Sequence, residues 1–181
     1  MKRIFLLSAL FLCNYFAEAN VRLPKIFGEG MVLQRNQAIP VWGWADKGEL
    51  VSVQFHDQAI VTKADKFGKW RVNLKPEAAG GPFQLSIKGN NSIVVSDVLV
   101  GEVWLCSGQS NMEWSVRLAK NAEREMREAN NSLIRHFKVP NTIAKDPRDD
   151  VAGGQWIAAS NETVGDFTAV GYYFARELYK E

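Results

Sequence analysis

The sequence predicts an α/β domain preceded by an antiparallel β-sandwich, and three patterns support this prediction. The first half of the chain alternates between apolar and polar residues, which is typical of short strands with one buried face. Continuous apolar runs follow at 98–100 and 103–106, as in strands that are covered on both faces. Beyond Ser115 the apolar residues recur with a helical period. We therefore expect the sandwich at residues 20–97 and the α/β domain at residues 98–181.

The N-terminal segment has the three parts of a secretory signal peptide. Lys2 and Arg3 give a positive start, an apolar run extends from Ile4 to Leu12, and Ala17-Glu18-Ala19 is a small-x-small cleavage pattern. The apolar run is shorter than the about 20 residues that a membrane-spanning helix needs. We expect residues 1–19 to be removed and the protein to be exported, periplasmic or secreted, with no membrane association afterwards. The alternative is a buried N-terminal helix.

Charge and cysteine usage exclude several classes of partner and cofactor. Twenty-two Lys and Arg stand against 20 Asp and Glu, and no basic block indicates a nucleic acid or an anionic membrane as partner. Two His residues make a His-rich metal site improbable, and no pattern indicates a nucleotide or redox group. Loss of Cys13 with the signal peptide leaves Cys106, which excludes an internal disulfide. We expect neither a cofactor nor a metal.

The predicted sandwich strands are separated by turn sequences rich in Gly, Asp, Asn and Pro. Their inward-facing residues are expected to be Val51, Val53, Phe55, Trp70, Val72, Leu74, Phe83, Leu85 and Ile87. Trp42 and Trp44 share one face of another strand, where we interpret them as core. The alternative is a platform on which a sugar ring stacks. His56 falls on the polar side of its strand, where we expect a surface residue without a role.

Ser110 lies where the predicted buried strand that ends at Cys106 turns into a helix. In open α/β sheets ligands bind beyond the carboxyl ends of the strands, so this hydroxyl would face a crevice. Unpaired N–H groups at the start of the helix could stabilise an oxyanion, and Gly108 would allow a tight turn. Ser110 is therefore a candidate nucleophile. The alternative is that it caps the helix, and Cys106 is expected to be an inert core thiol.

The run Gly101–Trp114, GEVWLCSGQSNMEW, resembles the signature of the sialate O-acetylesterase family, which are carbohydrate esterases of the SGNH-hydrolase superfamily with a flavodoxin-like catalytic domain. Met31–Arg35, Val41–Ala45 and Gly68–Trp70 are similar to the N-terminal β-domain of that family. Phe167–Leu178 is similar to a helix further into its catalytic domain. The resemblance covers essentially the whole chain after the signal peptide.

The resemblance implies a reaction and a substrate. Ser110 would attack the acetyl carbonyl of an O-acetylated sugar, most plausibly sialic acid, and water would release acetate from the acetyl-enzyme. Gly108, Gln109 and Asn111 would shape the nucleophile turn and support the oxyanion. Glu113 is either a general base or a charge at the helix N-terminus. Two alternatives are an esterase for acetylxylan or another acetylated glycan, and a non-catalytic carbohydrate-binding protein.

The catalytic base of the family does not match any position of this sequence. The His and Asp of the family lie close together near the end of the catalytic domain, but this chain has no Asp-x-x-His. His136 is the only His after Ser110, and it falls in a predicted strand. At about 30 residues per βαβ unit, residues 98–181 hold two or three strands, fewer than a full sheet. We expect an N-terminal portion of a longer esterase that is inactive or unstable alone.

Overall fold

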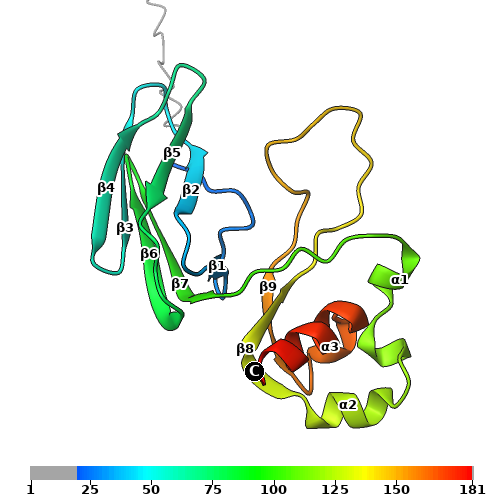
Figure 1. Ribbon diagram of the computed structural model, residues 1–181. Coiled ribbons are helices and arrows are strands. Elements are labelled where there is room, and N and C mark those ends of the chain that lie inside the picture. The colour runs from blue at the N-terminus through cyan, green and yellow to red at the C-terminus, as the bar shows by residue number, and fades with distance from the viewer. Residues whose placement is uncertain (1–19, 181) are drawn as a thin grey trace, which may run out of the picture.

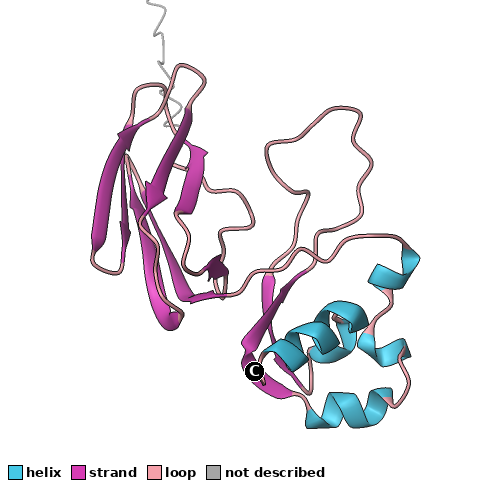
Figure 2. Cartoon of the chain, viewed as in Figure 1, coloured by secondary structure: helices cyan, strands magenta, loops and turns pink. Residues whose placement is uncertain are grey.

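The computed structural model describes residues 20–180, and the predicted signal peptide at residues 1–19 lies outside the described residues. Two parts follow each other along the chain (Figure 1). The first contains seven strands, and the described helices all lie in the second, as Figure 2 shows. No helix within residues 20–180 has the length and apolar character needed to cross a membrane.

The first part is built from two sheets. One is a five-stranded sheet in the order β1-β7-β6-β3-β4, and the other pairs β2 with β5. The bounds of the strands are β1 Val32–Gln34, β2 Ile39–Trp44, β3 Leu50–Phe55, β4 Gln58–Lys63, β5 Lys69–Leu74, β6 Gly80–Lys88 and β7 Ser92–Gly101. All pairs are antiparallel except β1 and β7, which run parallel with Val32 opposite Leu99. The expectation of purely antiparallel strands is therefore wrong at β1, where the long connection between the two strands permits parallel pairing.

Buried residues from both sheets form one hydrophobic cluster, which we call the first core. It consists of Val21, Phe27, Met31, Leu33, Ile39, Val41, Val51, Val53, Phe55, Ala64, Trp70, Val72, Leu74, Leu85, Ile87, Val95, Val98 and Val100. Eight of the nine residues expected to face inward belong to it, and Phe83 packs against its edge. The period of two thus located the buried face of β3, β5 and β6.

Trp42 packs against the first core without being fully buried in it, and Trp44 is not among the residues that pack there. The buried positions of β2 are Ile39, Val41 and Gly43, so the two tryptophans lie on its half-buried face. Trp42 packs edge-on against Phe27 with ring centroids 4.7 Å apart, and the guanidinium of Arg22 lies 5.6 Å from the ring centroid of Trp44. Gly43 leaves no room to reverse this orientation, because a side chain there would collide with the Arg22 carbonyl and the Trp70 ring.

The second part has short helices beside a two-stranded sheet. Its elements are α1 Ser110–Glu113, the 3-10 helix η1 Val116–Leu118, α2 Ala122–Glu128, β8 Asn130–Phe137, β9 Trp156–Ser160, the 3-10 helix η2 Val164–Asp166 and α3 Ala169–Leu178. The second core contains Val116, Ala129, Ile134, Ala159, Val164, Phe167, Ala169 and Tyr172. The helix expected after Ser115 is split into η1 and α2, because Asn121 between them adopts a left-handed φ of 61°.

The prediction of a buried strand at 103–106 is wrong. Residues 98–100 form the end of β7, but 103–106 continue as extended chain outside any strand, and Leu105 is 91% exposed. No described strand lies beside this segment to pair with it or cover it. The strand expected around His136 exists as β8, but it pairs antiparallel with β9. The connection between them, 138–155, contains no crossover helix, so it does not impose parallel pairing.

Contacts between the two parts are made chiefly by β8, β9 and the 138–155 connection, which extends toward the first part in Figure 1. The indole N–H of Trp156 donates a hydrogen bond to the Ile26 carbonyl at 2.8 Å. The 138–155 connection forms ion pairs between Asp150 and Lys25 at 3.2 Å and between Asp149 and Lys69 at 2.8 Å. These contacts hold the second part against the sheets of the first.

Candidate functional site

A groove of about 1250 Å³ runs along the segment from Gly101 to Ser110. The end of β7, the strand β8 with the chain that follows it, and one face of α3 form its other walls. Its apolar lining includes Trp104, Leu105 and Phe174, which are 58%, 91% and 42% exposed. The rings of Trp104 and Phe174 contact edge to face at 5.1 Å. This groove brings together most of the residues that the sequence singled out.

The segment that enters the groove is anchored to the first part. The Arg35 N–H donates to the Gly101 carbonyl at 2.9 Å, continuing the pairing of β1 with β7. The side-chain carbonyl of Gln34 accepts a hydrogen bond from the Val103 N–H at 2.9 Å, and its amide donates to Glu102 at 3.1 Å. The position of the chain approaching Ser110 therefore depends on β1.

Ser110 is the first residue of α1, and its side chain is exposed at the edge of the groove. Gln109 occupies the N-cap position, and no side chain caps the helix. The Ser110 hydroxyl forms no hydrogen bond with another residue of the described chain. The helix-cap interpretation of Ser110 is thus wrong in this structure, because the serine lies one position past the cap.

The turn before Ser110 is compact. The Met112 N–H donates to the Gln109 carbonyl at 2.8 Å. A Cβ at Gly108 would come within 2.8 Å of the Met112 Cγ, so the glycine leaves room for the methionine. Asn111 is exposed beside Ser110. Gly108, Gln109 and Ser110 all line the groove.

The chain around α1 is fixed to the start of α3. The Thr168 hydroxyl donates to the Met112 carbonyl at 2.5 Å, and the Ala169 N–H donates to the Trp114 carbonyl at 2.8 Å. Ser115 and Thr168 form an isolated antiparallel bridge. Thr168 could not be identified from the sequence as a support for the Ser110 turn, because it lies 58 residues away along the chain.

Glu113 ends α1 and is exposed. Its carboxylate accepts a hydrogen bond from the side-chain amide of Asn141, which lies in the 138–155 connection. The carboxylate therefore engages Asn141 and makes no hydrogen bond with Ser110 among the described residues. Asn141 was not a candidate from the sequence, since nothing there connects it to the turn.

His136 lies on β8 in the wall of the same groove. Its ring stacks on Phe167 with centroids 4.6 Å apart and planes inclined by 24°. Burial, and secondarily the charge of Lys138, lower the pKa of His136. The neutral imidazole is therefore favoured, but no hydrogen bond joins it to Ser110 within residues 20–180.

Cys106 is exposed, so the expectation of a core thiol is wrong. The error has the same origin as the missing strand, because residues 103–106 are not covered by neighbouring strands. A Cβ built on Gly171 would lie 3.3 Å from the Cys106 sulfur and 2.8 Å from Thr168. Gly171 therefore allows α3 to approach the groove segment closely.

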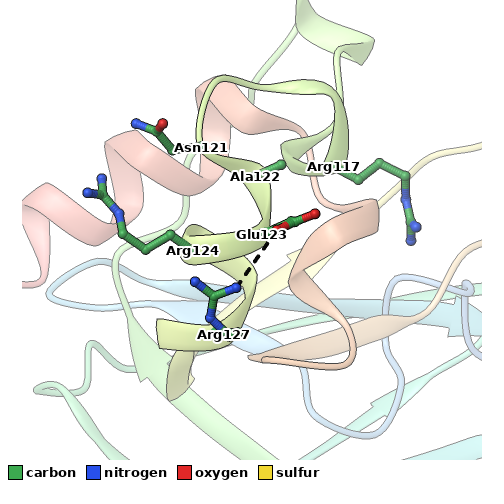
Figure 3. A pocket seen from close by; sticks show the side chains of 6 residues that line it. All are labelled: Arg117, Asn121, Ala122, Glu123, Arg124 and Arg127. Atoms are coloured by element: carbon green, nitrogen blue, oxygen red, sulfur yellow. Dashed lines mark ion pairs between the residues drawn. The ribbon is translucent and has the colours of Figure 1, made fainter.

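A smaller concavity of about 470 Å³ lies over η1 and α2 and was not predicted (Figure 3). Arg117, Arg124 and Arg127 line it together with Glu123. Carboxylates partner all three arginines: Asp166 binds Arg117 at 2.6 Å, Glu125 lies 3.4 Å from Arg124, and Glu123 lies 4.0 Å from Arg127. This balance of charge makes the concavity a weak candidate for an anion.

The chain is similar in sequence to sialate O-acetylesterases. The sialate O-acetylesterases of Pongo abelii and Homo sapiens are each 33% identical to this chain over 87% of its length, and that of Rattus norvegicus is 35% identical over 82%. The chain spans about a third of the length of these relatives, 34%, 34% and 31% respectively. A comparison with models of protein families found no match.

A solved structure with the same fold is that of a carbohydrate acetylesterase from Xanthomonas citri. It superposes with a TM-score of 0.85 at 43% sequence identity, over 87% of this chain and 37% of that protein.

Proposed function

The chain belongs to the sialate O-acetylesterase family, and from this premise we propose that it carries the nucleophile of a carbohydrate O-acetylesterase. The observation that supports this proposal best is the Ser110 hydroxyl, which is exposed beside the groove and does not cap the helix. In this proposal, residues 20–97 form a β-sandwich that supports the first portion of an SGNH esterase domain at 98–181. Export through the signal peptide at 1–19 is part of the same proposal.

Ser110 Oγ forms a bond to the acetyl carbonyl carbon, and the sugar oxygen leaves with a proton. Water then attacks the acetyl-enzyme and releases acetate. In this proposal the Ser110 N–H stabilises the oxyanion, and it is available to do so because it donates to no backbone oxygen within residues 20–180. Gly108, Gln109 and Asn111 hold the turn, and Thr168 positions it through the Met112 carbonyl.

The hydroxyl proton of Ser110 needs a base. The described groove offers His136, but its ring is stacked on Phe167 rather than hydrogen-bonded to Ser110. We therefore expect ester hydrolysis by this polypeptide alone to stay near background. An added base that diffuses into the open groove should take the Ser110 hydroxyl proton in place of a protein side chain.

Hydrolysis of an aryl acetate with added imidazole tests the nucleophile. We expect the rate to exceed that of S110A by a margin that grows with imidazole, because imidazole acts as the base for the Ser110 hydroxyl. Imidazole also attacks the ester directly, and subtracting the rate measured with S110A corrects for this background reaction. H136Q should behave like the wild type. Equal rates for wild type and S110A at all imidazole concentrations would exclude Ser110 as the nucleophile.

The sugar is proposed from the names of the relatives, which are sialate O-acetylesterases, together with the carbohydrate acetylesterase of known structure. We propose O-acetylated sialic acid as the substrate. Acetate release from O-acetylated sialic acid and from acetylated xylan, measured under the same imidazole conditions, separates this proposal from a plant-glycan esterase. A Ser110-dependent rate confined to xylan would reassign the substrate while leaving the nucleophile in place.

A further inference from the structure

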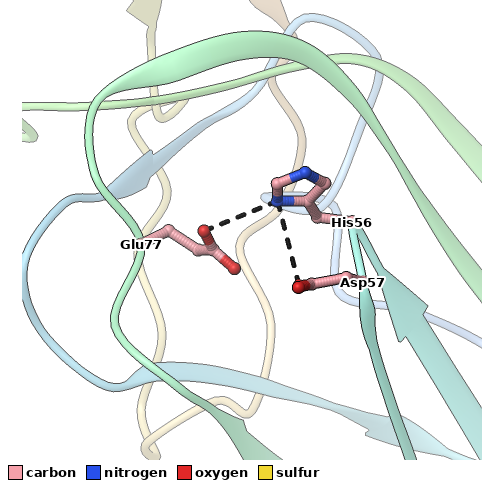
Figure 4. Close-up of side chains that lie close together, drawn as sticks. All are labelled: His56, Asp57 and Glu77. Atoms are coloured by element: carbon pink, nitrogen blue, oxygen red, sulfur yellow. Dashed lines mark ion pairs between the residues drawn. The ribbon is translucent and has the colours of Figure 1, made fainter.

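Three side chains of types that can bind a metal ion meet beside the β3–β4 hairpin (Figure 4). His56 and Asp57 form the turn between β3 and β4, and Glu77 lies between β5 and β6. His56 Nδ1 is 3.6 Å from Glu77 Oε2 and 4.0 Å from Asp57 Oδ1. One ligand atom from each residue lies within 4.8 Å of the other two. The sequence placed His56 on a strand face, whereas the turn directs its ring between two carboxylates.

Neighbouring residues hold two of the three groups in place. Gln58 donates a hydrogen bond to Glu77 Oε1 at 2.5 Å, so that Oε2 remains directed at His56. The side-chain carbonyl of Gln58 in turn accepts from the Lys75 N–H at 2.7 Å. The His56 ring packs against Phe83 with centroids 5.0 Å apart. Outer partners of this kind orient the ligands of a metal and keep their donor atoms available.

The third group has freedom to adjust. The Asp57 side chain is 83% exposed, whereas that of Glu77 is 17% exposed. Two ligand atoms of a tetrahedral zinc are about 3.4 Å apart, given metal–ligand distances near 2.1 Å. The separation between His56 and Glu77 is close to this value, and a small movement of Asp57 brings its carboxylate into range. A water molecule would complete the tetrahedron.

The donor set selects among cations. One imidazole nitrogen with two carboxylate oxygens suits zinc, whereas calcium and magnesium prefer oxygen ligands alone. The three residues are not part of the groove lining, but Ala79 and Gly80, which follow Glu77, do line it. The Glu77 carbonyl also accepts a hydrogen bond from the Asn36 N–H at 2.8 Å, two residues beyond the end of β1.

We propose that His56, Asp57 and Glu77 bind one zinc ion. This ion fastens the β3–β4 turn to the connection between β5 and β6, which continues into the groove lining at Ala79 and Gly80. Cys106 is the one cysteine within residues 20–180, so no disulfide provides such a link there. The site is independent of the proposed esterase activity, since none of its ligands touches the groove. It differs from the sequence-based expectation of no metal, which rested on the scarcity of histidine.

The proposal is tested by titrating the full chain with zinc chloride at pH 7.5. Calorimetry measures the binding, and thermal unfolding measures the change in the unfolding midpoint. We expect one zinc per chain and an unfolding midpoint that rises by a few degrees, because the ion binds only the folded arrangement. H56A and E77Q should each weaken binding at least tenfold. Magnesium and calcium chlorides should leave the midpoint unchanged.

Three further variants serve as controls. E29Q removes an exposed carboxylate outside the cluster, and C106S and H136Q remove the other strong zinc ligands of the described chain. All three should keep one zinc per chain with unchanged affinity. Circular dichroism checks that H56A and E77Q are folded, and D57N provides a third, milder test. An unsaturable titration, or unchanged zinc affinity in folded H56A, would show that the cluster is an ion pair only and overturn the proposal.

Discussion

Arg135 and Asp97 join the second part of the molecule to the first through a two-pronged ion pair. Arg135 Nη1 and Nη2 donate to the two Asp97 carboxylate oxygens at 2.7 and 3.2 Å. The Arg135 side chain is 8% exposed, although Asp97 remains 42% exposed. Asp97 sits within β7 with a left-handed φ of 55°, and Arg135 belongs to β8, next to His136. The pair therefore sets the position of the groove wall.

We expect R135A to lower the free energy of unfolding by about 2 kcal/mol, because it leaves Asp97 without its partner at the junction. R135K should recover only part of this loss, since an ammonium cannot form the paired hydrogen bonds. Urea unfolding measures both. R71A, at an exposed arginine, serves as the control and should change stability by less than about 0.5 kcal/mol. Equal stability of R135A and R71A would show that the pair does not join the parts.

D97N separates charge from backbone conformation at the same junction. Asparagine tolerates a left-handed φ, so this change removes the charge without straining the turn in the chain. We expect a loss of about 1 kcal/mol, smaller than that of R135A. D97A should be less stable than D97N, because alanine adopts a positive φ at a cost. If D97A and D97N had the same unfolding midpoint in urea, the backbone at this position would contribute nothing.

The stability of the protein should fall as the pH drops from 7 toward 5. Burial lowers the pKa of His136 in the folded state below its usual 6.5, so the unfolded chain binds a proton that the folded chain does not. Stability is therefore highest above the unfolded-state pKa and declines as the pH falls toward the folded-state value. Urea unfolding at several pH values measures the decline. The carboxyl group of Glu125 has its pKa lowered by Arg176, so its own contribution is lost only in more acidic solution.

H136Q should remove this decline between pH 7 and 5, since glutamine does not titrate. The variant keeps a polar side chain beside Phe167 and tests the titration apart from packing. A decline of the same size in wild type and H136Q would assign it to another group.

Substitution of Leu105 distinguishes the observed extended segment from a buried strand. L105S should change the free energy of unfolding by less than about 0.5 kcal/mol, because the side chain is 91% exposed. A leucine in a buried strand would cost about 2–5 kcal/mol on truncation. L85A is the matched control, since Leu85 is 0% exposed in the first core, and it should show that larger loss. Equal effects of L105S and L85A in urea unfolding would contradict the position of Leu105.

Glycan binding separates the esterase from a carbohydrate-binding protein that uses its tryptophans. Binding through the groove should persist in W42A and W44A, because these residues do not line it. It should weaken in W104A, whose indole is 58% exposed in the groove. Titration of O-acetylated sialic acid against these three variants and S110A measures this. Binding lost in W42A and W44A, yet intact in W104A and S110A, would favour the binding protein.

The sequence predicted the interior of the first part better than that of the second. Val51, Val53 and Phe55 alternate with polar residues, and that pattern depends only on having one face buried. The apolar run at 103–106 implies burial on two faces, which needs neighbouring strands that the described chain does not place there. Local pattern carries no information about such neighbours, and the exposure of Cys106 follows from the same gap.

The turn at Ser110 was located from its sequence signature, but the distant residues that hydrogen-bond to this turn were not predicted. Gly108 and Gln109 are adjacent in sequence, so a motif includes them. Thr168 and Asn141 reach the turn only through tertiary folding, by hydrogen bonds to Met112 and Glu113. Pairs this far apart leave no periodic signal in a single sequence.

The link from Gln34 to Val103 gives the chain an order of assembly. Gln34 and Val103 are 69 positions apart, and we expect their hydrogen bond to form only after β1 pairs with β7, because that pairing brings the two residues together. A contact of such long range forms late, after the loop-closure entropy of the intervening strands has been overcome. The approach to Ser110 is therefore a product of the completed first part. Fraying at the β1 edge would release the chain that leads to Ser110, and it would be detected as a loss of amide-exchange protection at Val103.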